Sequence, residues 1–379
     1  MLLALLLAVQ SPQAAGSEVV VIGERLKRIH DQCKAGECTP LRDAQASIAW
    51  AEAQFREGRY VDAKRTLAAA AARMKRHAAT HPKPVAAVYE AYATVAWQEG
   101  DQDDYRDAVA GRVRTLRAHL PADDLHVRAA ALAYGDMWLR LGKTFAADRA
   151  YREAGRDAAE AGRHDVALRA LLARARLRRF VGDKAGAAAL LREAEAVPFA
   201  DRSLARGAIA ATRVRLAMQD EDGPEVEEAL RALRATGLPR PALLWSPPVP
   251  LTAPDLTRTG NPVALDAVPS PNSQSADISR IRWADIGFWI RPDGRVAEAE
   301  RLRGSRAAGW VPPYIARIAG RRYTAFDAGQ EEGIYRIERL TLRGNYDVPK
   351  GSLIRRRWGA AKLEVLDLTD PNAKVTASR

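Results

Sequence analysis

The chain has 379 residues, of which 47% are hydrophobic and 28% are charged, which suits a folded protein and excludes a disordered or fibrous one. The formal net charge is +12, and residues 277–379 carry +7 of it, with 20 basic against 13 acidic side chains. Such a basic region suits nucleic acid, anionic lipid or a cell-wall polymer, although most basic clusters are solvated faces. The length allows two or three domains.

The first nine residues are almost all Leu and Ala, and the small residues Ala14, Ala15 and Gly16 follow after a polar step. This order is typical of a secretory signal peptide, and nine apolar residues are too few to span a bilayer. Residues 1–16 are therefore predicted to be a leader that directs export, which makes nucleic acid an unexpected partner. An N-terminus packed into the core is the alternative.

The two cysteines, Cys33 and Cys38, lie in a loop-like stretch that contains Gly36. An oxidising compartment favours a disulfide between them, and the glycine provides a turn that brings their Cβ atoms together. We predict that this disulfide pins the N-terminal segment, residues 17–39, to the first helix of the next domain; two free thiols are the alternative. Zinc is disfavoured because it needs about four ligands, and the two cysteines are separated by four residues.

Five glycines punctuate residues 44–237 at intervals of 42, 42, 40 and 41 residues, namely Gly58, Gly100, Gly142, Gly182 and Gly223. A fixed period of this length is the signature of a solenoid built from helical hairpins. Each glycine is predicted to end the first helix of a hairpin in the left-handed conformation. The residue five positions later is predicted to lie where two helices cross. A non-repetitive helical bundle is the alternative.

The small and apolar residues that follow each glycine are predicted to form the buried face of the second helix of each hairpin. This part of the pattern resembles the tetratricopeptide repeat, although the period is longer than the 34 residues of that family. The resemblance implies that residues 40–238 form a tetratricopeptide-like solenoid with a concave surface for another protein. Three tryptophans recur near the ends of the predicted first helices and are expected to pack between hairpins: Trp50, Trp97 and Trp138.

Nine prolines fall within residues 239–271, which excludes a helix or a central strand there. Residues 239–276 are predicted to be a semi-rigid extended linker. Leu243, Leu244 and Trp245 would be exposed in a free linker, so residues 240–251 are expected to dock on the folded part of the chain.

Residues 277–370 are predicted to form a small second domain, followed by a tail at residues 371–379. Alternating residues at 284–290 indicate a strand, Pro292 to Gly294 a turn, and residues 296–302 a return strand. Two prolines open a predicted helix at 311–321. Residues 333–343 indicate a third strand, although apolar residues spaced by three also suit a helix there. Residues 362–368 form a further short strand or a tail.

The order of strand, Asp-Gly turn, strand, helix and strand, with the run FWIRPDGRV at residues 288–296, resembles the C-terminal domain of TonB-type energy transducers. The small residues Gly304 and Ser305 and the run RRYTAF at 321–326 stand at matching steps, although the proline that follows in the family is missing. The fold class is therefore multidomain α+β: a helical hairpin solenoid followed by a ββαβ domain. The resemblance implies a periplasmic protein of a Gram-negative bacterium, with peripheral membrane contact at most.

In that family an exposed strand edge pairs with an extended peptide of an outer-membrane receptor, a mode known as β-augmentation. The matching strand is residues 333–342, and the resemblance implies that it binds a protein or peptide of the cell envelope. Its two arginines are the expected contacts for an acidic segment. The predicted partner-binding residues are Ile334, Arg336, Glu338, Arg339 and Leu340.

No residue pattern indicates a reaction, a cofactor or a metal. His77 and His81 have helical spacing, but no further ligand accompanies them. The basic run at residues 355–357 could grip an anionic polymer or lie on the surface. The first hypothesis is a non-enzymatic periplasmic adaptor or scaffold. A TonB-type energy-transducer component of outer-membrane transport is the second, and an enzyme that uses a groove between the domains is the third.

Overall fold

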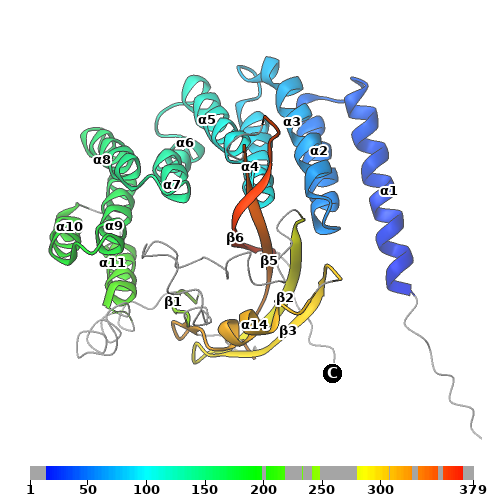
Figure 1. The fold of residues 1–379 in the computed structure, drawn as a ribbon. Coiled ribbons are helices and arrows are strands. Elements are labelled where there is room, and N and C mark those ends of the chain that lie inside the picture. Colours follow the sequence, from blue (N-terminus) through cyan, green and yellow to red (C-terminus); the bar gives the residue numbers. More distant parts are fainter. Residues whose placement is uncertain are drawn as a thin grey trace, which may run out of the picture.

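The computed structural model describes residues 14–198, 202–217, 233, 241–247, 280–306, 308–326, 332–348 and 353–369. Within these residues the chain is an α+β protein in which helices α1–α11 precede a small antiparallel sheet. Figure 1 shows the helices arranged as an arch with the sheet on its inner side. Among the described helices, none combines the length and the hydropathy of a membrane span.

The disulfide between Cys33 and Cys38 is present, as predicted. It joins the end of α1 (Ala14–Lys34) to the loop before α2 (Pro40–Arg56), and the two helices pack against each other. Residues 1–13 of the predicted leader lie outside the described part of the chain.

Four helical hairpins follow the predicted glycine period. Hairpin 1 is α2 with α3, hairpin 2 is α4 with α5, hairpin 3 is α7 with α8, and hairpin 4 is α9 with α10. The glycines between their helices have φ angles of 81°, 96°, 73° and 86°, a conformation that only glycine adopts without strain: Gly58, Gly100, Gly142 and Gly182. Gly223, the fifth glycine of the pattern, lies outside the described residues.

The remaining helical bounds are α3 (Tyr60–Met74), the 3₁₀ turn η1 (Lys75–His77), α4 (Pro82–Glu99), α5 (Gln102–His119), α6 (Leu125–Ala130), α7 (Ala133–Arg140), α8 (Thr144–Glu160), α9 (His164–Phe180), α10 (Lys184–Ala196) and α11 (Arg202–Ala217).

The residue five positions after each hairpin glycine is buried, as the sequence predicts for a close helix crossing: Ala63, Tyr105, Ala147 and Ala187. The tryptophans Trp50 and Trp97 are buried, and Trp138 is half-buried between two of the hydrophobic clusters. These positions confirm that the repeated pattern marks the core of each hairpin. The side chain that caps α6 belongs to Asp124.

The sheet has the strand order β3-β2-β5-β6, with every neighbouring pair antiparallel. The predicted strand, turn, return strand and helix are confirmed as β2 (Arg282–Ile290), a tight turn at Gly294, β3 (Val296–Gly304) and α14 (Pro312–Ala319). Residues 334–347 are strand β5 (Ile334–Asp347), so the helical alternative there is wrong. Strand β6 (Arg356–Asp367) is longer than the short strand predicted at 362–368.

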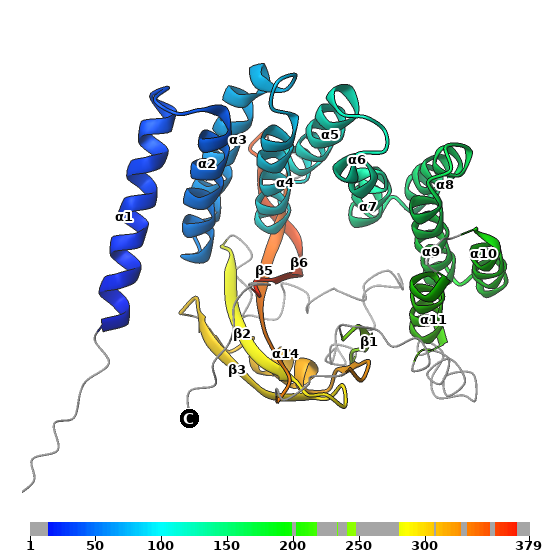
Figure 2. The same cartoon turned by 180° about the vertical axis from the view of Figure 1, so that it is seen from behind.

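The two faces of the sheet are covered by different helices. On one face, alternate residues of β2, among them Ile286, Phe288 and Ile290, pack with Tyr314 and Ile318 of α14 in one hydrophobic cluster. The other face lies against α2–α4, as Figure 2 shows from behind. A strand that lies between these two layers is buried on both faces. Its sequence therefore lacks the alternation of hydrophobic and polar residues that usually identifies a strand.

Residues 241–247 of the predicted linker dock on the folded chain, as expected. They contain β1 (Leu243–Trp245), which pairs with β4 (Arg322–Tyr323) of the sheet domain. Leu243 packs against the core beneath the sheet, whereas Leu244 packs against α11. The Arg215 side chain on α11 also donates to the Leu243 carbonyl at 3.1 Å. This segment therefore joins the last described helix of the array to the sheet domain.

Candidate functional site at the inner face of the helical array

One face of β5 carries the residues that contact the helices. Arg339, Thr341 and Arg343 alternate along the strand and are all fully buried. Successive side chains of a strand point to opposite faces, so these three form a single row directed at the ends of α2 and α4. The row consists of two cations and a hydroxyl, which is an unusual composition for a buried surface.

Arg339 binds the C-terminal turn of α2. Its guanidinium donates to the carbonyl oxygen of Phe55 and, at 2.9 Å, to that of Arg56. The same group donates to both carboxylate oxygens of buried Asp285 at 2.6 and 2.8 Å. It lies 4.1 Å from the ring centre of Trp283, with the Phe55 ring also within 4.8 Å. The charge is thus neutralised by a bidentate carboxylate and by the negative end of a helix dipole.

Arg343 makes the equivalent contact with α4. Its guanidinium donates to the Trp97 carbonyl at 2.5 Å and to the Gln98 carbonyl at 3.1 Å. Glu364 of β6 accepts from Arg343 at 3.1 Å and from the Trp97 indole at 2.7 Å. Burial raises the pKa of Glu364 above its ordinary value, although nearby Arg343 opposes that change. Both arginines therefore bind helix C-termini, where cations are stabilised by the orphan carbonyls.

The hairpin glycines allow the sheet to approach the helices closely. A Cβ atom at Gly58 would lie 2.2 Å from the indole nitrogen of Trp283, and one at Gly100 would lie 2.7 Å from the Gly344 carbonyl oxygen. Between them, the hydroxyls of Tyr60 and Thr341 are 3.0 Å apart, and burial raises the pKa of Tyr60 to about 12. Gly58 and Gly100 thus have two roles: they adopt the backbone conformation of the turn, and they leave room for the sheet.

A cluster of charged residues surrounds this contact at the start of α5. Lys64 lies within 2.8 Å of Glu99 and within 2.7 Å of Asp101. Arg355 binds Asp101 at 2.8 Å, and Arg357 binds Glu99 at 2.7 Å. Burial favours the neutral form of Asp101, but the hydrogen bonds from Lys64 and Arg355 outweigh it and lower the pKa of Asp101 to about 2. Two arginines of the basic run at residues 355–357, which the sequence left open as a surface run or a site for an anionic polymer, therefore bind carboxylates at the end of α4 and the start of α5.

The expectation that residues 333–342 form a free edge is wrong. Strand β5 pairs with β2 on one side and with β6 on the other, because residues 356–367 form a long strand that occupies the predicted edge. Of the predicted partner contacts, Arg339 and Leu340 are buried within the chain and Glu338 binds Arg321 at 2.8 Å.

The other two predicted contacts lie at the end of β5 beyond its pairing with β6. Arg336 binds Asp367 of β6 at 3.1 Å, and Ile334 is half-buried. The outer strands among those described are β3 and β6. Strand β3 has two irregularities in its register with β2 and carries exposed charges. Bulges and charges are the features that protect an edge strand from pairing with another chain.

The two histidines with helical spacing, His77 and His81, contact neighbouring side chains. His77 accepts a hydrogen bond from Arg76, and His81 contacts Thr80. Among the described residues, no group of three or more His, Cys, Asp or Glu side chains is placed to hold a metal ion.

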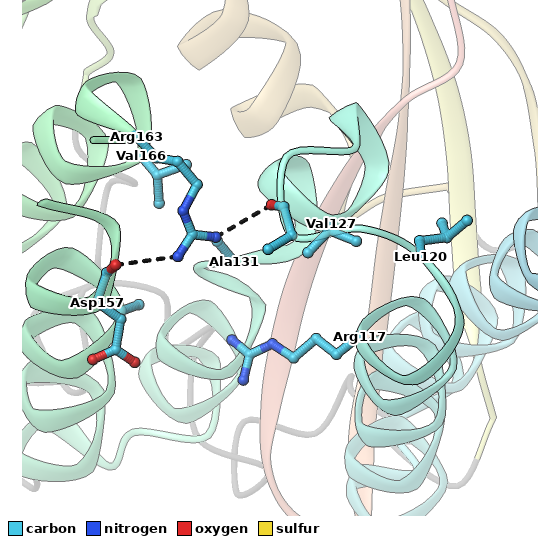
Figure 3. A pocket seen from close by; sticks show the side chains of 9 residues that line it. Arg117, Leu120, Val127, Ala131, Asp157, Arg163 and Val166 are labelled. Atoms are coloured by element: carbon cyan, nitrogen blue, oxygen red, sulfur yellow. Dashed lines mark hydrogen bonds between the residues drawn. The ribbon is translucent and has the colours of Figure 1, made fainter. Parts of the chain in front are cut away.

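A pocket of about 250 Å³ lies between the loop after α5 and helices α8 and α9 (Figure 3). Its walls are mainly apolar, and Arg163 spans it by donating to the carbonyls of Ala122 and Asp157. A second pocket, of about 490 Å³, lies between α8, α9 and α10 and includes His164 and Glu193. The lining of neither contains a Ser, Thr or Cys that a neighbouring base could activate.

No protein-family model matches the chain, and no curated protein matches its sequence.

Proposed function

We propose that the chain is a non-enzymatic adaptor of the periplasm, in which a tetratricopeptide-like array recognises extended protein segments. The observation that carries this proposal is the row of Arg339, Thr341 and Arg343, which binds two successive hairpins of the array. A repeat scaffold gives each hairpin an equivalent surface, so a strand laid across it meets a periodic set of contacts.

Strand β5 of the sheet domain is an example, within this chain, of an extended segment that the array binds. Its order of two strands, α14 and a further strand supports a TonB-like origin. Because β5 and β6 lie against the array, we assign partner binding to the array and not to the predicted edge at residues 333–342. The predicted leader and the Cys33–Cys38 disulfide support an oxidising compartment.

The experiment uses the full chain with a C-terminal tag, produced with its leader in a Gram-negative host related to its source. Cell fractionation and N-terminal sequencing determine where the mature chain resides and where it begins. Chemical cross-linking in intact cells, followed by capture through the tag, identifies proteins held in fixed stoichiometry. We expect a periplasmic chain, cleaved near Ser17, with at least one envelope protein absent from a tag-only control. A cytoplasmic chain, or no specific partner, would contradict the proposal.

A further inference from the structure

The turns of hairpins 3 and 4 are open, whereas the equivalent turns of hairpins 1 and 2 are covered by the sheet. Among the described residues, nothing lies within 4 Å of a Cβ atom placed at Gly142 or Gly182, in contrast to Gly58 and Gly100. Figures 1 and 2 both show β5 and β6 beside α4, with α8–α10 farther along the arch. The array therefore presents two occupied turns and two open ones in one continuous series.

Apolar side chains are exposed at the open turns. The residue three positions before the glycine is Phe55 in hairpin 1 and Trp97 in hairpin 2, with 4% and 7% exposure, but Leu139 in hairpin 3 is 38% exposed. Phe145, three positions after Gly142, is 93% exposed. Phe180 and Val181, directly before Gly182, are 45% and 54% exposed. Large apolar side chains exposed together at neighbouring turns mark an interaction surface.

The charge of the turns reverses between hairpin 2 and hairpins 3 and 4. The turn of hairpin 2, residues 99–104, has four carboxylates and no basic residue, and it receives Arg355 and Arg357 from the sheet domain. The turn of hairpin 3, residues 139–145, has Arg140 and Lys143 and no carboxylate. The turn of hairpin 4, residues 178–184, has three basic residues and one carboxylate. A segment that complements hairpins 3 and 4 must therefore be acidic where β5 and β6 are basic.

We propose that the turns of hairpins 3 and 4 bind an extended segment of another protein that carries carboxylates and large apolar side chains. The apolar groups would pack on Phe145, Phe180 and Val181, and the carboxylates would meet Lys143 and the basic turn of hairpin 4. This inference rests on the proposed adaptor function and specifies which surface of the array binds the partner and what chemistry it recognises.

The test is a selection from random linear twelve-residue peptides displayed on phage, against the full disulfide-bonded chain. A counter-selection uses the variant Phe145→Ser/Phe180→Ser. We expect the enriched peptides to combine net negative charge with large apolar residues. A labelled enriched peptide should bind in fluorescence anisotropy and weaken at least tenfold in this variant and in Lys143→Glu. Leu125→Ser, which removes an exposed apolar residue on α6, should leave the affinity unchanged. Circular dichroism and thermal melting confirm that every variant is folded.

Failure to enrich any peptide, enrichment of basic peptides, or affinities equal in all variants would overturn the inference. Binding of the same residues to anionic phospholipid vesicles without peptide binding, or to a second copy of the chain in sedimentation, would also overturn it. If an envelope protein is still captured by the Phe145→Ser/Phe180→Ser variant, the adaptor function stands and this site is wrong. If no envelope protein is captured by the wild-type chain either, the adaptor function itself fails.

Discussion

Arg339 and Arg343 are four residues apart on β5, and they bind the ends of two helices whose equivalent residues, Phe55 and Trp97, are 42 positions apart (97 − 55). Residues four apart on a strand are separated by about 13 Å, and at this separation the two guanidinium groups reach the C-terminal ends of both helices. The spacing of the two arginines thus matches the helical repeat, and the sheet is held in a fixed register on the array.

We expect Arg339→Leu to destabilise the protein by roughly 3–5 kcal/mol, because it leaves Asp285 buried with Arg303 as its remaining basic partner. The double variant Asp285→Leu/Arg339→Leu should be less destabilised, since neither buried charge remains and the half-exposed Arg303 can be hydrated. Urea unfolding followed by circular dichroism measures both. The control is Arg336→Ala, whose ion pair with Asp367 is more exposed and should contribute less than about 1 kcal/mol. A double variant as unstable as the single one would contradict this account.

Substituting alanine for two hairpin glycines separates two contributions to stability: the backbone conformation of the turn and the contact with the sheet. Gly100 and Gly142 have φ angles of 96° and 73°, so alanine strains both backbones by about 1 kcal/mol. Only at Gly100 would the new Cβ meet the Gly344 carbonyl, at 2.7 Å. We expect Gly100→Ala to lose a further 1–3 kcal/mol, roughly the cost of overpacking. Thermal unfolding of the two variants makes the comparison, and equal losses would show that the sheet does not rest on this turn.

The charged cluster at the start of α5 predicts a dependence of stability on pH. The pKa of Asp101 is lowered from 3.8 to about 2 in the folded chain, so its contribution is present above pH 4 and disappears as the pH falls through 2. Asp101→Asn keeps a side chain that caps α5 and removes the charge. We expect the variant to be less stable than the wild type by about 2 kcal/mol at pH 7, with the difference vanishing near pH 2. A difference that is constant with pH would refute this assignment.

Loss of the disulfide should loosen the N-terminal helix. Closing so short a loop stabilises a chain by about 2 kcal/mol in the chain-entropy model, and Cys33 is buried where α1 meets α2. We expect Cys33→Ser/Cys38→Ser to speed amide hydrogen exchange in α1 and to leave α4 and α5 unchanged. Exchange followed by mass spectrometry resolves the two regions. Unchanged protection in α1 would mean that helix packing alone holds it.

The hairpin turns and the first strands of the sheet could be predicted from sequence because local chemistry determines them. Gly58 and Gly142 stand where only glycine adopts the required backbone, and Gly294 follows an aspartate in a tight turn between β2 and β3. These signals depend on a few neighbouring residues. The rest of the chain does not alter them.

The position of β5 could not be predicted in the same way. Helices and strands distant in sequence cover both of its faces and one of its edges, and β6 pairs with most of the other edge. The hydropathy and charge of β5 alone therefore do not indicate where it lies. Arg339 looked like a surface contact because arginine is rarely buried. It is buried because Asp285, from another strand, and the carbonyls of α2 replace its hydration. The four-residue spacing of Arg339 and Arg343 was the available signal, and it has meaning only beside the 42-residue period.

The pairing of β1 with β4 has a mechanical consequence for the array. The sheet is bound to α2 and α4 through β5, and to α11 through Leu244 and Arg215. The sheet domain thus connects the two ends of the arch to each other. Straightening the arch must break either the short β1–β4 ladder or the arginine row, so tension applied between the two ends would release the sheet before the hairpins unstack.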